Sequence, residues 1–236
     1  MEKSRKKTDN LFVVGTDTGV GKTVLSLLLM QFFYARGYNP FYLKPAQTGC
    51  VDPHDVDSDA RFIYQHVEAL KEKDPADSVI YCFKNPKAPY FAARDEGKKI
   101  DLETIKKTAN EKSSSYSPVI LEAAGGLLVP ITEKLMVIDM IEITGIRPII
   151  AARAGLGTIN HTLLTLDTLS RRGIEPASIV FLDSGENGIS QEMISENIEA
   201  IEKISGIKVG GTVGKIKDFS NPKQDCYQPL ERIFDK

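Results

Sequence analysis

Four residues near the start of the chain have the spacing of a phosphate-binding loop. They are Gly15, Gly21, Lys22 and Thr23, between the apolar run 11–14 and a helical pattern that starts near Lys22. Backbone N–H groups of such a loop and of the following helix N-terminus wrap a polyphosphate. The lysine reaches the outer phosphates, and the threonine hydroxyl can ligate Mg²⁺. The stretch therefore predicts a nucleotide site with Mg²⁺, and the two glycines are expected to allow its tight backbone.

A second lysine and two carboxylates are further candidates for chemistry. Lys44 and Glu122 each follow a short apolar run, and Asp59 precedes a helical pattern. Because ligands gather at the carboxyl ends of parallel strands, Lys44 is expected near the phosphate loop, where it would clamp a transferring phosphoryl group or hold a carboxylate. Thr23, Asp59 and Glu122 are the candidate Mg²⁺ ligands, since this ion prefers hydroxyl, carboxylate, phosphate and water oxygens.

These assignments have alternatives in the sequence. Considered alone, Lys44 could equally be an exposed lysine at a strand end without a function. Its expected position beside the phosphate loop favours a functional role. Asp52, Asp55 and Asp57 compete with Asp59 for the metal, and a solvated acidic loop would explain all four.

A third candidate is the start of a later helix. Gly157-Thr158-Ile159-Asn160 opens a helical pattern. The free N–H groups of a helix N-terminus form a site for a carboxylate. On spacing alone, a plain capped helix start explains these residues equally well.

Length and composition set the class of protein. The 236 residues, 42% of them hydrophobic, fit one α/β domain over 1–236. A net charge of −2 gives no electrostatic case for nucleic acid or an acidic membrane surface as partner. No apolar run approaches the ~20 residues of a membrane-spanning helix. Cys50, Cys82 and Cys226 lie far apart and are expected to be reduced thiols of a cytoplasmic protein.

Predicted strands alternate with predicted helices along the chain. The strands cover 11–14, 41–43, 78–83, 118–121, 147–152, 179–182 and 208–213, and the helices 24–36, 60–70, 91–94, 101–112, 137–144, 158–172 and 190–204. Pro45 is expected to end the second strand, and Asp101 and Ser190 to cap their helices. Several strands are continuous apolar runs, so the predicted fold class is α/β, a mainly parallel sheet with helices on both faces, as in phosphate-loop NTPases. Residues 1–9 are expected to form a disordered leader and 215–236 an irregular C-terminal segment.

In their order and spacing the motifs resemble the dethiobiotin synthetase family of the biotin pathway. The matching motifs are the phosphate loop 15–23, Lys44-Pro45 with Gln47-Thr48-Gly49, Glu122 with Gly125-Gly126, and Gly157 to His161. They extend over about residues 11–215, which is most of the chain.

The resemblance implies an enzyme, an ATP- and Mg²⁺-dependent cyclo-ligase. In the family, 7,8-diaminopelargonate takes up CO₂ (supplied as bicarbonate) as an N-carbamate. A carbamate oxygen attacks the γ-phosphate of ATP to give a carbamic–phosphoric anhydride. The second amine then closes the ureido ring and expels phosphate. The resemblance also implies a cytoplasmic homodimer.

The resemblance carries roles over to individual positions. The residues that would bind the nucleotide are Gly19, Val20, Gly21, Lys22, Thr23, Val24, Asp59, Glu122, Gly125, Leu182 and Asp183. Lys44, Lys22 and Thr18 would be the catalytic residues, and Thr23, Asp59 and Glu122 would bind Mg²⁺. Those that would hold the carbamate, the diamine or its tail carboxylate are Thr18, Thr48, Gly157, Thr158 and Asn160.

The chain departs from the family pattern at three positions. Ala123 replaces a glycine, Leu182 replaces an asparagine that reads the adenine edge, and Lys217 replaces a proline. Leucine cannot hydrogen-bond a base, so we predict a relaxed preference among nucleoside triphosphates.

Other nucleotide-dependent proteins are alternatives. The first is a switch ATPase resembling the partition and division-site ATPases, which often carry an extra lysine early in the loop. Thr16-Asp17-Thr18 stands there instead. A cobyrinate synthase of the amidotransferase type would need an added glutaminase domain, for which the chain is too short. A pure binding module is the least favoured alternative, because it does not need two lysines and two carboxylates at these positions.

Overall fold

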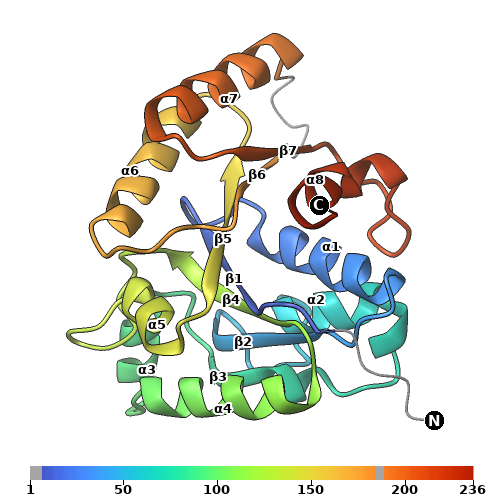
Figure 1. The fold of residues 1–236 in the computed structure, drawn as a ribbon. Helices are drawn as coiled ribbons and strands as arrows, with labels where there is room; N and C mark the ends of the chain where they lie inside the picture. Colours follow the sequence, from blue (N-terminus) through green and yellow to red (C-terminus); the bar gives the residue numbers. More distant parts are fainter. Residues whose placement is uncertain (1–6, 184–188, 236) are drawn as a thin grey trace.

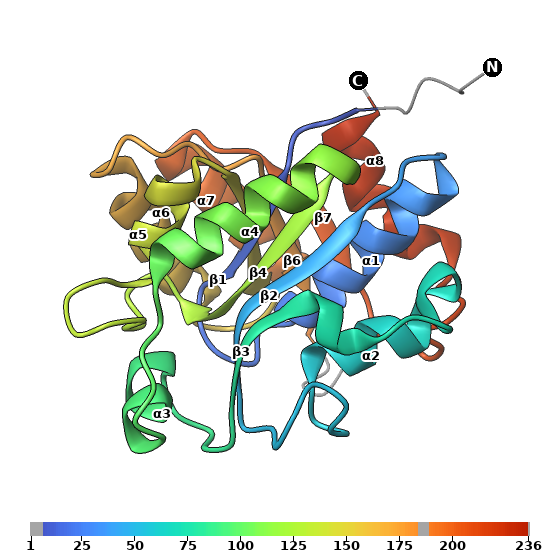
Figure 2. The same ribbon diagram turned by 90° about the horizontal axis from the view of Figure 1, so that it is seen from below.

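Seven parallel strands form one sheet in the computed structural model, which describes residues 7–183 and 189–235. The spatial order is β3-β2-β4-β1-β5-β6-β7 (Figure 1, Figure 2), and each neighbouring pair is parallel. The strands are β1 Leu11–Gly15, β2 Phe41–Thr48, β3 Val79–Phe83, β4 Val119–Gly126, β5 Arg147–Arg153, β6 Ile179–Leu182 and β7 Val209–Val213. The α/β prediction is confirmed, and the strand predicted over 78–83 is the edge strand β3.

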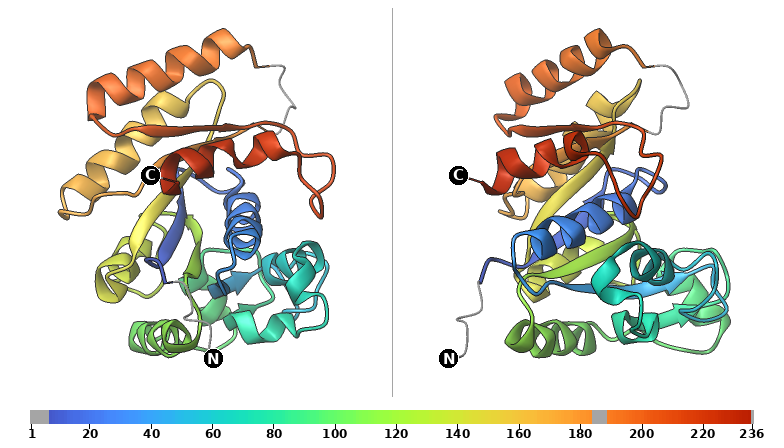
Figure 3. Two further views of the ribbon diagram at one scale, coloured as in Figure 1. Left: turned by 45° about the vertical axis from the view of Figure 1, so that its right-hand side comes forward. Right: turned by 90° about the vertical axis from the view of Figure 1, so that its right-hand side faces the viewer.

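Helices cover both faces of this sheet, as Figure 3 shows. The α-helices are α1 Lys22–Ala35, α2 Asp59–His66, α3 Pro89–Asp95, α4 Leu102–Ser115, α5 Val137–Thr144, α6 Thr158–Ser170, α7 Gln191–Ser205 and α8 Gln228–Phe234. Short 3-10 helices span Glu68–Leu70, Pro75–Ser78 and Gln224–Tyr227. Helices α1, α2 and α8 pack in one apolar layer, and α4, α5, α6 and α7 pack in the other. The sheet is therefore buried on both faces, as its continuous apolar strands require.

Local signals in the sequence explain several helix boundaries. The Asp101 side chain accepts from the backbone N–H groups of Glu103 and Thr104, so it caps α4 as predicted. Ser190 likewise caps α7 by accepting from the N–H of Met193. The helix predicted over 60–70 is divided, because α2 ends at His66 and a 3-10 turn follows.

Strand β2 corrects one expectation, because Pro45 does not end it. The strand continues to Thr48. It pairs with β4 only over 41–43, and from Lys44 onward it pairs with β3. Pro45 therefore lies where the strand has one partner, and a missing N–H is tolerated there as on an edge strand.

The C-terminal segment corrects a second expectation. We predicted that 215–236 is irregular, but it contains α8, which packs on β7. Leu230 is fully buried in the apolar layer of α1. The burial of that side chain outweighs the polar composition of the segment. Residues 1–6 of the predicted leader 1–9 lie outside the described residues. Thr8, within the same leader, exchanges hydrogen bonds with Ser117.

Candidate functional site

The order of the central strands brings three sequence motifs together. Strand β4 lies between β1 and β2, and the phosphate loop connects β1 to α1. Lys44 lies on β2 and Glu122 on β4, at the same edge of the sheet as this loop. Parallel strands place their carboxyl ends at one edge, so residues far apart in the sequence meet there, as predicted.

The phosphate loop has the backbone that its glycines were expected to allow. Gly21 caps α1 with a left-handed φ of 92°, which a residue with a side chain rarely adopts. A Cβ at Gly15 would lie 2.7 Å from the carbonyl oxygen of Asp17. The loop therefore needs glycine at both positions, once for conformation and once for space.

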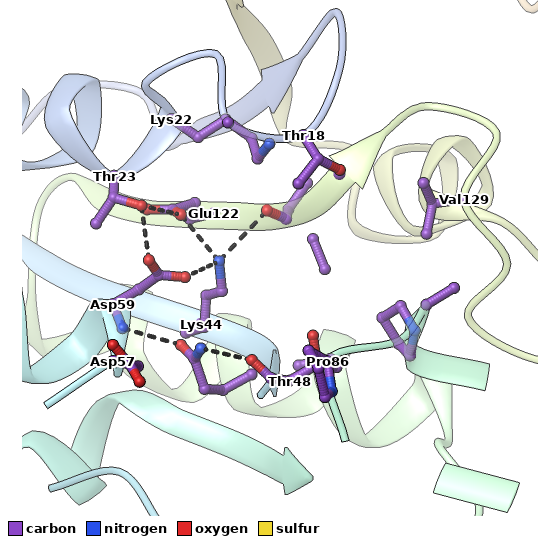
Figure 4. A pocket seen from close by; sticks show the side chains of 18 of the residues that line it. Thr18, Lys22, Thr23, Lys44, Thr48, Asp57, Asp59, Pro86, Glu122 and Val129 are labelled. Carbon is purple, nitrogen blue, oxygen red and sulfur yellow. Dashed lines mark hydrogen bonds and ion pairs between the residues drawn. The ribbon is translucent and has the colours of Figure 1, made fainter. Parts of the chain in front are cut away.

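Thr23 joins the two candidate metal-binding carboxylates. Its hydroxyl lies 2.7 Å from Oδ1 of Asp59 and 3.0 Å from Oε1 of Glu122 (Figure 4). Three oxygen ligands of the kind that Mg²⁺ prefers thus converge beside a phosphate loop, and the donor set fits that ion. Among the described residues no group of three or more His, Cys, Asp or Glu side chains could hold a metal, so such an ion would take its further ligands from phosphate and water.

Lys44 lies between the same two carboxylates. Its Nζ is 2.6 Å from Oδ2 of Asp59 and 2.8 Å from Oε1 of Glu122. Burial alone would lower the pKa of Lys44, but the negative charges of Asp59 and Glu122 raise it above its usual range. Burial raises the pKa of Asp59, but the charge of Lys44 together with the hydrogen bonds from Lys44 and Thr23 lowers it below its usual range. The cluster joins one buried ammonium to two carboxylates, of which Asp59 is partly exposed, and the opposite charges hold one another in place.

Lys22 supplies a second cation at the loop. Its Nζ donates to the carbonyl oxygen of Asp17 at 2.9 Å, and only 7% of the residue is exposed. Burial and the nearby charge of Lys44 lower the pKa of Lys22 to about 8. A polyphosphate would relieve both effects, because it supplies negative charge to two lysines held close together.

A cavity of about 670 Å³ opens onto this cluster. The predicted site residues that line it are Thr18, Gly19, Gly21, Lys22, Thr23, Val24, Lys44, Thr48, Asp59, Glu122 and Gly125. Val20 instead packs in the apolar layer of α1. Among the competing aspartates, Asp55 accepts from the N–H of Val51 within its own loop, and Asp57 also lines the cavity. Asp59 is the one that contacts both Thr23 and Lys44.

Two groups of predicted residues lie outside that cavity. Gly157, Thr158 and Asn160 form the start of α6, after the adjacent strand β5. The Thr158 hydroxyl is buried against that of Thr162, so its side chain faces the helix rather than a ligand. Leu182 packs beside Gly21, where its Cγ would lie 2.7 Å from an added Cβ. Asp183 follows it and borders 184–188, which lie outside the described residues.

Several residues that line the cavity or hold the carboxylates were given no role from the sequence. Pro86, Lys87, Ala88 and Pro89 line the cavity. Gln47 accepts the backbone N–H of Asp59 at 3.1 Å and so holds the start of α2. No spacing rule points to these positions, because they reach the site through β2 and β3.

The substitution at Ala123 is accommodated. Its side chain is fully buried in the apolar layer that contains α4 and α5. Its carbonyl oxygen lies 3.4 Å from Nζ of Lys44. The added methyl is therefore packed in the core.

Within the described ranges, 7–183 and 189–235, none of the helices is long and apolar enough to cross a membrane.

Comparisons with known proteins identify the family. A family model described as an AAA domain matches residues 9–223. The ATP-dependent dethiobiotin synthetase BioD of Anaeromyxobacter sp. (strain K) is 41% identical over 176 residues, which are 74% of this chain and 77% of that protein. The protein of the same name from Methanococcus vannielii is 31% identical over 212 residues, 89% of this chain and 95% of that one.

Solved structures agree on the fold. The MinC:MinD cell division protein complex of Aquifex aeolicus matches with a TM-score of 0.61 at 14% identity, over 97% of this chain and 96% of that chain. A ParA family ATPase from Chlorobium tepidum matches with a TM-score of 0.52 at 12% identity, over 97% and 90%. At such identities the likeness shows the fold alone. The sequence relatives decide the family, and the chain belongs to the ATP-dependent dethiobiotin synthetases.

Proposed function

We propose that this protein uses ATP to close the ureido ring of dethiobiotin from 7,8-diaminopelargonate and CO₂. The observation that carries the proposal is the meeting of Lys44, Asp59, Glu122 and Thr23 beside a phosphate loop. Such a cluster suits a reaction that concentrates negative charge at one place, and phosphoryl transfer to an anionic nucleophile is such a reaction.

Thr23, Asp59 and Glu122 would hold Mg²⁺ in this proposal. The fit rests on the convergence of their oxygens within 3.0 Å of the Thr23 hydroxyl. When bound, the ion would neutralise charge on the outer phosphates. Lys22 and the loop N–H groups would hold the same phosphates from the other side.

Lys44 would act on the nucleophile. One amine of the substrate adds to CO₂ and loses a proton to give a carbamate. A carbamate oxygen then forms a bond to the γ-phosphorus while the bond to ADP breaks. The second amine attacks the carbamate carbon and loses a proton to the departing phosphate or to solvent, and phosphate leaves with that oxygen. The Lys44 ammonium would hold the carbamate anion in position for its attack on phosphorus and would stabilise the phosphate as it leaves.

The organic substrate would occupy the cavity of about 670 Å³. Thr18 and Thr48 line it and would hydrogen-bond the carbamate or the diamine. Its tail carboxylate would extend beyond this cavity, toward the proposed dimer interface, to the free N–H groups at the start of α6, where Gly157 leaves the helix end open and Asn160 is exposed. The buried Thr158 would contribute its N–H rather than its hydroxyl.

We also propose a cytoplasmic homodimer. Leu128, Leu156 and Leu164 are exposed by 60%, 96% and 58%, which is typical of apolar surface that a partner covers. They lie just after β4, before α6 and on α6. Three free thiols agree with a reducing compartment. Sedimentation analysis tests the dimer, and a monomer at micromolar concentration would contradict it.

A switch ATPase is the second candidate, favoured only by the fold it shares with MinD and ParA. The experiment that separates the two supplies diaminopelargonate, bicarbonate, Mg²⁺ and ATP and identifies the product. Dethiobiotin formation supports the synthetase. Phosphate release that is independent of the diamine, with no ring-closed product, supports the switch.

A further inference from the structure

Tyr42 contacts the oxygen of Glu122 that faces away from Thr23 and Lys44. Its hydroxyl donates to Oε2 of Glu122 at 3.0 Å, and the residue is 1% exposed. Oε1 of the same carboxylate accepts from Lys44 at 2.8 Å and from Thr23 at 3.0 Å. The carboxylate is thus held at both ends, with separate partners for each oxygen.

The register of the two strands explains this arrangement. Tyr42 pairs with Ile120 where β2 and β4 run side by side. Side chains two residues apart lie on one face of a strand, so Tyr42 and Lys44 share a face with Ile120 and Glu122. Tyr42 and Lys44 therefore reach the carboxylate from successive positions on β2.

A bound metal would affect the contact of Lys44 with Glu122 and the contact of Tyr42 with Glu122 differently. A metal bound by Thr23, Asp59 and Glu122 would lie near Oε1, where the Lys44 ammonium now sits. The contact of Tyr42 with Oε2 is on the other side of the carboxylate and need not break. This hydrogen bond to Oε2 can therefore keep Glu122 oriented while Lys44 moves away from Oε1.

We propose that Tyr42 is a positioning residue, which holds the Glu122 carboxylate in the orientation that Mg²⁺ binding needs. The inference rests on the proposed metal site at Thr23, Asp59 and Glu122. Partners of this kind, which bind a metal ligand rather than the metal, commonly change metal affinity 10–100-fold, as a rough range. Tyr42 itself does not line the cavity.

The test compares Tyr42→Phe with Tyr64→Phe. Tyr64 is also a buried tyrosine, and its hydroxyl bonds Ser78 at 2.8 Å, away from Glu122. Each variant loses one buried hydroxyl hydrogen bond, so both are expected to lower the thermal midpoint. Only Tyr42→Phe is expected to weaken metal binding.

Metal binding is read directly with Mn²⁺ as a paramagnetic substitute for Mg²⁺, on the protein with ADP. We expect about tenfold weaker Mn²⁺ binding for Tyr42→Phe and no change for Tyr64→Phe. The Mg²⁺ concentration for half-maximal phosphate release should rise by the same factor, with the rate at saturating Mg²⁺ nearly unchanged.

Three results would overturn the inference. They are unchanged Mn²⁺ binding in Tyr42→Phe, equal weakening in both variants, and failure of the unmodified protein with ADP to bind Mn²⁺. The binding measurement needs no diamine, so a protein that does not make dethiobiotin would still report on Tyr42.

Discussion

The ammonium of Lys44 lies 2.8 Å from Oε1 of Glu122, an oxygen that also accepts from Thr23. Asp59 completes the cluster at 2.6 Å from the same ammonium. A divalent cation held by Thr23, Asp59 and Glu122 would compete with the Lys44 ammonium for both carboxylates. We therefore expect metal binding to weaken the hold of these carboxylates on Lys44, which frees the ammonium to interact with the phosphates.

The variant Lys44→Ala should separate these two roles. Turnover should fall by roughly 10²–10³-fold, as for the loss of one donor to a developing anion. Mn²⁺ should bind more tightly, because Asp59 and Glu122 lose their competing cation, and ADP binding should stay within about threefold, since Lys22 and the loop hold the phosphates. Calorimetry and a phosphate-release assay measure these quantities. Unaltered turnover would remove Lys44 from the mechanism.

The variant Glu122→Gln keeps the shape of the side chain and removes its charge. We expect the half-saturating Mg²⁺ concentration to rise by at least about tenfold, since loss of a ligand should cost no less than loss of its supporting partner. Glu142→Gln is the matched control, because Glu142 pairs with Arg172 on the surface of α5. Equal Mg²⁺ dependence in the two variants would argue against the assigned metal site.

Base selectivity is expected to be weak. Leu182 stands at the end of β6, where the family carries an asparagine, and its side chain packs beside Gly21. Leucine offers no hydrogen bond to a base edge. The kcat/KM values for ATP, GTP and CTP should therefore agree within about tenfold, which is the effect of roughly one hydrogen bond. A strong preference for ATP would show that other residues read the adenine.

The C-terminal helix should contribute to stability. Leu230 on α8 is fully buried against the layer of α1. Leu230→Ala should lower the free energy of unfolding by about 2–5 kcal/mol, as for other buried leucines. Ile204→Ala serves as control, because that side chain is 67% exposed. Urea denaturation measures both variants, and equal midpoints would mean that α8 is not docked in solution.

The sequence predicts the parts of this molecule whose cause is local. The apolar runs between helical patterns locate all seven strands of the described residues. Asp101 and Ser190 cap the helices that they were expected to cap. Lys44 and Glu122 could be placed near Lys22 because parallel strands end at one edge of the sheet.

Features that depend on distant partners could not be predicted in this way. β2 continues past Pro45 because β3 pairs with it there, and that pairing has no signal near the proline. Helix α8 forms because β7 makes room for it: an added Cβ at Gly210 would lie 2.6 Å from Cδ1 of Ile233. Glycine in a strand indicates close approach of another segment, and Gly210 and Gly211 carry that signal in the sequence.

The same distinction between local signals and distant partners applies to the residues of the candidate site. Lys44 and Glu122 were found because each follows an apolar run in the sequence. Tyr42 and Gln47 contact Glu122 and Asp59 and were given no role. A buried tyrosine or glutamine in a strand has the same sequence pattern whether it packs in a core or orients a carboxylate. Only the register of β2 on β4 distinguishes the two.

The most direct test of the proposed reaction follows the oxygen atoms of the released phosphate. The enzyme is given ATP, Mg²⁺, diaminopelargonate and freshly dissolved unlabelled CO₂ in water enriched in ¹⁸O, and is sampled before hydration exchanges the CO₂ oxygens. We predict one dethiobiotin for each phosphate, and phosphate that contains no oxygen from water, because its fourth oxygen comes from the carbamate. Phosphate that carries one water-derived oxygen, as in simple ATP hydrolysis, would contradict the account.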